Sequence, residues 1–176
     1  MKKDKWILAA AAGAGVAGLA YALWPKKNIP NNAIVSPFDK ERYMGKWHEI
    51  ARLPNLIQKN LKDLTEEYIA NADGSIKVIT RAYNAEKNKP VEAHGELKFK
   101  GPHTRGKLGV AYYLPIYLDY NVLAVDEHYQ HALVAGNSFK YLWILSRDGS
   151  ITEEIKSHFL NKASELGFDT WKLEWF

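Results

Sequence analysis

The acid–base and nucleophilic side chains of this 176-residue sequence do not fall into a catalytic pattern. Glu66 and Glu67 are adjacent on a predicted strand, so they point to opposite faces and cannot act as paired carboxylates. Glu49 and Glu66 share the inward-facing register and would form a buried pair or a polar contact for a ligand, although we expect ordinary ion-paired acids. The serines that follow Gly136 and Gly149 lie in predicted turns, and the G-x-S-x-G motif of a nucleophilic serine is absent.

The six histidines do not suggest a metal or haem site either. His128 and His131 are three residues apart beside a predicted turn, and His94 lies on the outer face of its strand. Other metal-binding side chains do not accompany them at ligand spacing. We therefore expect solvated surface histidines. The sequence has no cysteine, which rules out disulfides, cysteine-based zinc sites, iron–sulfur clusters and a thiol nucleophile. The expectation is a protein without metal, cofactor or catalysis.

The net charge of +4 is confined to the N-terminus. Residues 1–28 hold five lysines and one aspartate, which leaves residues 29–176 neutral. A neutral body without a phosphate-binding glycine loop offers no basic face to nucleic acid. The apolar content of 47% excludes a disordered chain, and the length fits one domain with a buried core.

Residues 6–24 form an uncharged apolar run flanked by lysines. As a helix this run spans roughly 28 Å, close to the ~30 Å hydrocarbon layer of a membrane. Trp6, Tyr21 and Trp24 would then lie at the two membrane interfaces. A cleaved signal peptide, with an A-x-A-like site at 20–22, is the alternative. The run is longer than the usual apolar region of roughly 7–15 residues in a signal peptide, so we favour an uncleaved anchor.

Both interpretations export the rest of the chain to the cell envelope. The domain would face the periplasm from an inner-membrane anchor or be released there by cleavage. The lack of cysteine excludes a lipid-acylated anchor. Prolines and asparagines mark 25–36 as an extended linker. The predicted organisation is a signal or anchor segment at 1–24, a linker at 25–36 and one domain at 37–176.

The predicted domain begins with short two-faced strands. Asp73-Gly74 is a strong hairpin signal, and residues 91–100 alternate between apolar and polar side chains. Such strands are typical of antiparallel sheets with water on one side. The first five predicted strands are 47–52, 64–72, 75–84, 91–100 and 107–114.

The strands that follow are apolar on both faces, so both faces must be covered. A predicted helix supplies the cover, with a capping box from Ser150 to Glu153 and Gly167 as C-cap. These three strands are 120–125, 132–135 and 141–145, and a last strand is predicted at 169–176.

Eight antiparallel strands with short connections tend to close into a barrel, which removes the sheet edges. The predicted fold class is all-β: an eight-stranded antiparallel up-and-down β-barrel with one C-terminal α-helix packed outside and a ninth strand. The N-terminal transmembrane or signal helix precedes it.

Three motifs, in order, resemble the lipocalin family. Gly45-Lys46-Trp47 matches its G-x-W motif, Leu118-Asp119-Tyr120 resembles its T-D-Y motif, and Arg147 matches its arginine at the closed end of the barrel. The runs 43–52 and 141–147 are similar to bacterial envelope lipocalins related to apolipoprotein D. The resemblance covers roughly residues 34–176. This sequence departs from the pattern at Leu118 and His48, and it lacks the lipobox cysteine common in bacterial relatives.

The resemblance implies structural roles for Gly45, Trp47, Asp119 and Arg147. The Arg147 guanidinium would lie over the Trp47 indole as a lid on the closed end. Such a cation–π contact is worth roughly 0.5–2 kcal/mol.

The resemblance also implies a barrel cavity that binds a fatty acid or lysophospholipid for lipid storage or transport. Alternation alone does not separate a hollow barrel from one filled by its own side chains. Tyrosines on the inner face would supply hydroxyl contacts to a polar head among apolar walls. The predicted ligand-binding residues are Tyr68, Val78, Thr80, Ala93, Leu97, Val110, Tyr112 and Tyr120.

Alternate loops of an up-and-down barrel share its open end, so loops 53–63, 85–90, 115–117 and 137–139 are expected there. Their apolar side chains ringed by lysines would suit a membrane-facing rim, with ordinary loop packing as the alternative. The apolar residues are Leu56, Ile57, Leu61, Pro115, Ile116 and Tyr117, and the lysines are Lys59, Lys62, Lys87 and Lys89.

Two other functional classes stay open. One is a calycin-type enzyme acting on a lipid or isoprenoid, for which Glu49, Glu66 and the inner tyrosines are the available groups. The other is a filled barrel that acts as a structural or interaction module. A homodimer also stays open.

Overall fold

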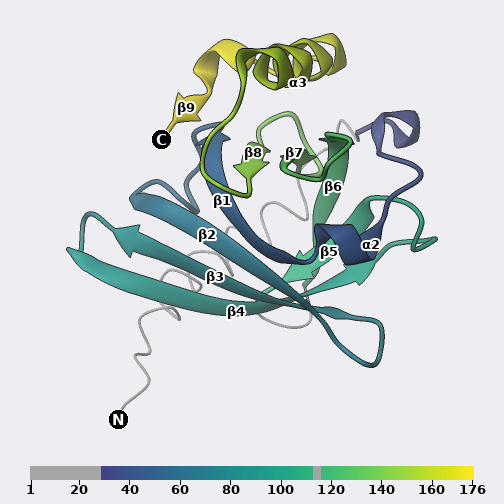
Figure 1. The fold of residues 1–176 in the computed structure, drawn as a ribbon. Coiled ribbons are helices and arrows are strands. Elements are labelled where there is room, and N and C mark those ends of the chain that lie inside the picture. Colours follow the sequence, from purple (N-terminus) through teal and green to yellow (C-terminus); the bar gives the residue numbers. More distant parts are fainter. Residues whose placement is uncertain (1–28, 113–115) are drawn as a thin grey trace.

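A computed structural model describes residues 29–112 and 116–176 of the chain (Figure 1). The predicted anchor at 1–24, with its membrane segment at 6–24, lies outside the described residues. So do residues 25–28 of the predicted linker and residues 113–115. Within the described ranges, no helix combines the length and the apolar character needed to cross a membrane.

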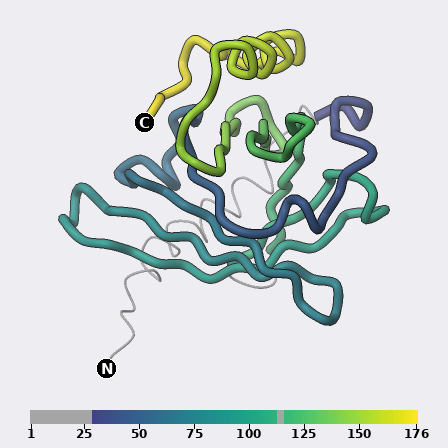
Figure 2. The backbone as a smooth tube through the Cα atoms, in the orientation of Figure 1, coloured from purple at the N-terminus to yellow at the C-terminus, as the bar shows by residue number. Residues whose placement is uncertain are grey.

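Eight antiparallel strands close into the predicted barrel (Figures 1 and 2). Each strand pairs with the next along the chain from β2 to β8, β8 pairs with β1, and β1 pairs with β2 to close the sheet. The eight strands are β1 (Gly45–Arg52), β2 (Leu61–Ala70), β3 (Ile76–Asn84), β4 (Lys89–Phe99), β5 (Lys107–Ala111), β6 (Leu118–Val125), β7 (His131–Ala135) and β8 (Leu142–Ser146).

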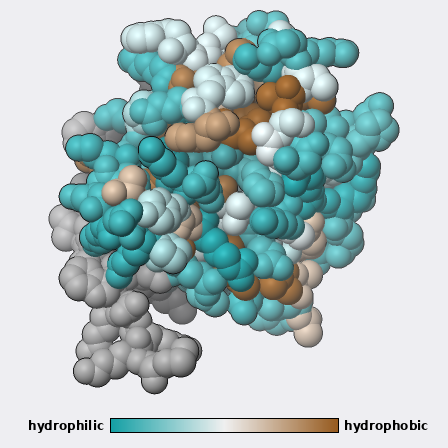
Figure 3. Space-filling model, turned by 60° about the vertical axis from the view of Figure 1, so that its left-hand side comes forward, coloured by the Kyte–Doolittle hydropathy of each residue, from teal (hydrophilic) through white to brown (hydrophobic). Residues whose placement is uncertain are grey.

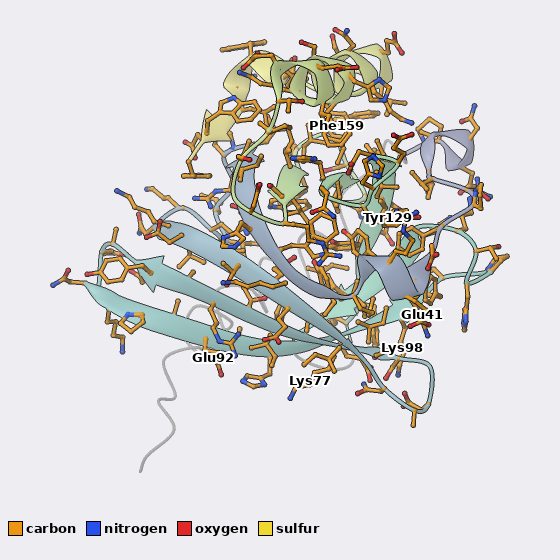
Figure 4. All side chains as sticks on the ribbon, in the orientation of Figure 1. Glu41, Lys77, Glu92, Lys98, Tyr129 and Phe159 are labelled. Atoms are coloured by element: carbon orange, nitrogen blue, oxygen red, sulfur yellow. The ribbon has the colours of Figure 1, made fainter. Side chains whose placement is uncertain are left out.

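The first strands follow the predicted alternation. The turn between β2 and β3 contains Gly74 at a φ of +87°, a conformation that favours glycine, and the Asp73 carboxylate accepts the Ser75 backbone N–H. Along β3 and β4, polar side chains such as Lys77, Glu92 and Lys98 point away from the barrel (Figure 4). The hairpin and the two-faced strands predicted from the sequence are confirmed.

The later strands lie between two separate hydrophobic clusters, as their apolar faces predicted. The inner cluster fills part of the barrel and includes Trp47, Val122 and Leu145. The outer cluster lies beneath the C-terminal helix and includes Leu133 and Ile144. Strands β6 to β8 contribute to both clusters, so they are buried on both faces.

The covering helix, α3 (Glu153–Leu166), begins later than predicted. Its N-cap is Thr152, whose hydroxyl accepts the Ile155 N–H, and Ser150 is not part of a capping box. The Ser150 hydroxyl and N–H both donate to Asp148 in the preceding turn, so they are not available to the helix. The predicted C-cap is confirmed, because Gly167 has a φ of +99°. Phe159 reaches from α3 into the outer cluster (Figure 4).

The last predicted strand is wrong over most of its length. Residues 169–176 form a 3₁₀ helix, η2 (Thr170–Lys172), and a two-residue strand, β9 (Glu174–Trp175). Strand β2 pairs with β1 over residues 45–48, and β9 pairs beyond it, opposite Ala51 and Arg52. Only a short stretch of β1 is left unpaired by β2, and β9 can pair with β1 only along that stretch.

The described part of the predicted linker, residues 29–36, belongs to the folded domain. Residues 29–36 contain a 3₁₀ helix, η1 (Asn31–Ala33), and Ile29 and Ile34 are buried in the outer cluster. The Val35 N–H donates to the Val122 carbonyl at 2.9 Å, which ties this segment to β6. A short helix, α2 (Lys40–Tyr43), then leads into β1. An extended tether therefore does not describe residues 29–36.

Candidate functional site

Trp47 and Arg147 meet at one end of the barrel. The Arg147 guanidinium carbon lies 3.8 Å from the centroid of the buried Trp47 ring, and the indole N–H donates to the Tyr43 carbonyl at 2.8 Å. Arg147 also donates to the carbonyls of Lys46 at 2.9 Å and Arg42 at 2.8 Å. These contacts join α2, β1 and the end of β8 at this end of the barrel.

The two other motif residues have structural surroundings as well. Gly45 has a φ of +92°, and a Cβ added there would lie 3.3 Å from the Arg147 Nη1 atom, so a larger residue would be strained and crowded. Asp119 forms an ion pair with Lys100. Because Tyr120 belongs to the inner cluster, its neighbour Asp119 points to the opposite face of β6.

The eight predicted ligand-binding residues divide into two groups by exposure. Tyr68, Val78, Leu97 and Tyr120 are buried. The other four keep intermediate exposure although they share the inward register, and they are Thr80, Ala93, Val110 and Tyr112. The second group marks the part of the inner wall that keeps some accessible surface.

Glu66 joins these residues in a polar cluster inside the barrel. Its carboxylate accepts hydrogen bonds from the hydroxyls of Tyr68 and Tyr112, the latter at 3.2 Å. The Tyr112 hydroxyl bonds to Thr80 at 2.7 Å, and the Tyr120 hydroxyl bonds to Tyr68 at 2.8 Å and to Tyr43 at 2.6 Å. We call these residues the interior polar cluster: Tyr43, Glu66, Tyr68, Thr80, Tyr112 and Tyr120.

Strand register and one glycine place the members of this cluster. Glu66 pairs with Thr80, and Thr80 pairs with Ala93, so the three lie in one row across β2, β3 and β4. A Cβ added to Gly95 would lie 2.9 Å from the Tyr112 ring and 2.9 Å from the Ala111 carbonyl. Glycine at this position therefore lets the Tyr112 ring lean over β4 towards Glu66.

Sequence alternation identified most of this cluster but not all of it. It placed the three strand tyrosines on the inner face and left Glu66 as one of several alternatives. It missed Tyr43, which lies on α2, where strand periodicity does not apply. The only sequence feature that points to Tyr43 is its position four residues before the tryptophan of the G-x-W motif. In the structure the Tyr43 carbonyl accepts a hydrogen bond from the Trp47 indole N–H.

Burial raises the pKa of the Glu66 carboxyl above its ordinary value of 4.5, and the hydrogen bonds from Tyr68 and Tyr112 oppose part of that rise. A carboxyl whose pKa is raised on folding stabilises the protein fully below its unfolded-state pKa and loses that contribution as the pH rises. We therefore expect the free energy of unfolding to fall, relative to a Glu66→Gln variant, as the pH increases above about 4.5. Denaturant titrations of both proteins across that range measure the difference. A constant difference would contradict the burial of an ionisable Glu66, and Glu67→Gln on the outer face controls for loss of a carboxylate.

Glu49 does not pair with Glu66 but belongs to a second buried network. Its carboxylate accepts from Arg52 at 2.6 Å and from the Gln58 side chain at 2.9 Å, and the Trp143 indole N–H donates to Gln58 at 2.8 Å. Arg52 also donates to the Leu61 carbonyl at 2.8 Å. Burial raises the pKa of Glu49 to about 7, against the opposing effect of Arg52. This network fastens the β1–β2 loop to the barrel wall.

The histidines do not share one environment. His94 and His128 are exposed, as expected. His131 differs from the prediction, because it is buried and its Nε2 atom lies 3.0 Å from the Ser150 carbonyl oxygen. It connects β7 to the turn before α3. Among the described residues, metal-binding side chains do not gather in groups of three or more.

Of the apolar residues predicted to form a rim at the open end, the well-exposed ones among the described residues lie in one loop. Leu56 is 87% exposed and Ile57 is 40% exposed in the β1–β2 loop. Leu61 and Ile116 are half-buried, and the Tyr117 hydroxyl donates to Glu96, which fits ordinary loop packing. Pro115 lies outside the described residues. Figure 3 shows a largely hydrophilic face, with apolar residues gathered at the level of β9 below α3.

A groove of about 860 Å³ lies outside the barrel. Residues from α2, from the β6–β7 turn and from α3 line it, among them His158 of α3. Figure 4 labels two of the others, Glu41 and Tyr129. It shares none of its lining residues with the interior polar cluster.

Comparisons with known proteins agree with this geometry. Residues 38–176 match the lipocalin-like domain family. The chain is 40% identical to the outer membrane lipoprotein Blc of Escherichia coli K12 over 142 residues, which are 81% of this chain and 80% of that protein. It is 24% identical to apolipoprotein D of Cavia porcellus over 151 residues, 82% and 79% of the two chains. The structure of insecticyanin from Manduca sexta has the same fold, with a TM-score of 0.70 and 23% identity over 86% of each chain.

Proposed function

The chain belongs to the lipocalin family, and from that premise we propose that its barrel binds a fatty acid or a lysophospholipid for storage or transport in the bacterial cell envelope. The observation that carries the proposal is the inner wall formed by Thr80, Ala93, Val110 and Tyr112, which stays partly accessible inside a closed barrel. Apolar walls with a few hydroxyl groups are the usual lining of a small-molecule site. Burial of an acyl chain contributes about 0.8 kcal/mol per methylene, enough for micromolar affinity after the cost of association.

Binding, rather than catalysis, is favoured by the partners of the two interior carboxylates. Glu49 is held by Arg52 and Gln58, and Glu66 is held by two tyrosines. A general acid or base needs to exchange a proton with a substrate. Each of these carboxylates is held in place by hydrogen bonds from at least two neighbouring side chains.

Location in the cell envelope is proposed from the relatives, several of which are named outer membrane lipoproteins. This chain has no cysteine to acylate, so we propose that the apolar segment 6–24 either anchors the protein in the inner membrane or is a signal removed after export to the periplasm. The proposal of inner-membrane attachment comes from residues 6–24 and not from these relatives, which are named as outer membrane lipoproteins.

A saturable titration tests the function. The full chain, with detergent kept below its critical micelle concentration, should bind a fluorescent fatty acid with a stoichiometry of one and release it to unlabelled lysophospholipid. Absence of saturable binding would contradict the proposal.

The exposed tip of the β1–β2 loop suggests how ligand enters from a membrane. We expect Leu56→Glu to slow the transfer of a fluorescent fatty acid from anionic vesicles several-fold while leaving its equilibrium affinity unchanged, because the loop tip inserts apolar surface into the interface. Stopped-flow transfer measurements give the rate. Ile69→Glu, at an outer-face residue that is 40% exposed, is the matched control. Equal transfer rates for the two variants would exclude a role for the loop tip.

A further inference from the structure

The interior polar cluster has a fixed direction of hydrogen bonding. A phenol hydroxyl has one proton, and that of Tyr68 goes to Glu66. The bond between Tyr68 and Tyr120 must then be donated by Tyr120, and the bond between Tyr120 and Tyr43 must be donated by Tyr43. Every proton in this branch points towards Glu66.

The second branch has the same direction. Tyr112 donates its proton to Glu66, so its oxygen accepts from the Thr80 hydroxyl. The pKa values of Tyr68, Tyr112 and Tyr120 are raised, first by burial and also by the charge of Glu66, so these hydroxyls keep their protons at neutral pH. The Glu66 carboxylate is therefore the terminal acceptor of both branches.

This carboxylate has acceptor capacity to spare and no cation beside it. An ionised carboxylate offers about four lone-pair positions, and the described residues donate to two of them. Within the described residues, Glu66 has no ion-pair partner, and the buried Arg52 is taken by Glu49 at 2.6 Å. When Glu66 is ionised, the cluster thus presents an acceptor without a counter-ion and no free hydroxyl proton.

Accessible surface remains on the residues around this acceptor. Glu66 keeps intermediate exposure, as do its row neighbours Thr80 and Ala93. Val110 and Ala93 provide apolar surface on the same inner wall. A hydrocarbon chain on that wall would bring a polar end group to Glu66.

We propose that Glu66 makes the barrel selective for single-chain amphiphiles whose end group donates hydrogen bonds, namely long-chain amines and alcohols, inserted with that group towards the interior polar cluster. This inference rests on the proposed lipid-binding function and adds the class of end group. An ammonium group beside Glu66 would favour its ionised form, whereas a fatty-acid carboxylate there would oppose ionisation of both groups, so we expect fatty acids to bind with the carboxylate towards the open end.

A matched ligand series tests the selectivity. Hexadecylamine, hexadecanol and hexadecanoate have chains of equal length and can be compared by displacement of the fluorescent fatty acid from the full chain. We expect hexadecylamine to bind at least about tenfold more tightly than hexadecanoate, the ratio that a buried charge-assisted hydrogen bond provides. Hexadecanol should lie between them.

Variants assign the preference to Glu66. Glu66→Gln should reduce the ratio of amine to carboxylate affinity to within about twofold, while Glu67→Gln on the outer face of the same strand, where Glu67 pairs with Arg81 at 3.0 Å, should leave it unchanged. Thermal melting of both variants checks that they are folded before their affinities are compared.

The possible results separate this inference from the function on which it rests. If the fluorescent fatty acid binds saturably and the three hexadecyl compounds have the same order of affinity in the wild type and in Glu66→Gln, the role of Glu66 is overturned. Lipid binding itself would remain supported. Tighter binding of hexadecanoate than of hexadecylamine to the wild type would do the same. Absence of probe binding to the wild type would overturn both.

Discussion

Replacement of Trp47 by alanine is expected to lower the free energy of unfolding by about 3–5 kcal/mol, as for other large buried aromatic residues. The side chain is 0% exposed and its ring centroid lies 5.0 Å from that of Tyr43 and 3.8 Å from the Arg147 guanidinium carbon. The substitution also removes the donor to the Tyr43 carbonyl, and Arg147 loses the surface on which it lies.

The same change at an exposed tryptophan is the control. Trp171 is 79% exposed, so Trp171→Ala should change the stability by about 0.5 kcal/mol or less. Chemical denaturation of the two variants beside the wild type gives both values. Equal stability of Trp47→Ala and wild type would show that the closed end does not depend on this residue.

Replacement of Val110 by tryptophan should weaken ligand binding at least about tenfold without unfolding the protein. Val110 lies on β5 opposite Leu97 and keeps intermediate exposure, so the larger ring has room on the inner wall. It would occupy space that a ligand chain needs. Loss of two buried methylenes already corresponds to about a tenfold loss of affinity.

Leu97→Trp is a poorer test of the same idea. Leu97 is fully packed, so tryptophan there should cost about 1–3 kcal/mol of stability through overpacking and would mix unfolding with loss of binding. Ile69→Trp on the outer face is the control for added bulk. Binding of the fluorescent fatty acid to Val110→Trp with wild-type affinity would place the ligand elsewhere.

The barrel could be predicted because its determinants are local in the sequence. Alternation in residues 91–100 identifies the inner face of β4, Asp73-Gly74 identifies a turn, and strands without polar faces require cover on both sides. These patterns state which way a side chain points. They do not state which groups that side chain contacts. Alternation therefore predicts that Glu66 faces inwards but does not predict its hydrogen bonds with Tyr68 and Tyr112.

The errors have physical causes of the same kind. Serine is a common N-cap residue, but the Ser150 hydroxyl and N–H donate hydrogen bonds to the Asp148 carboxylate instead. Residues 169–176 alternate like a strand, but β1 offers a short free edge for pairing. Tyr43 enters the interior polar cluster from a helix, and Gly95 admits the Tyr112 ring from a neighbouring strand. Such choices depend on which groups compete for a partner in three dimensions.

Native mass spectrometry of the full chain tests the central claim, that the barrel interior holds a lipid. Wild-type protein incubated with a lysophospholipid should carry one bound molecule, and Val110→Trp, confirmed as folded by thermal melting, should carry none under the same conditions. Wild-type spectra without bound lipid, or equal occupancy of the two proteins, would contradict a ligand site on the inner wall.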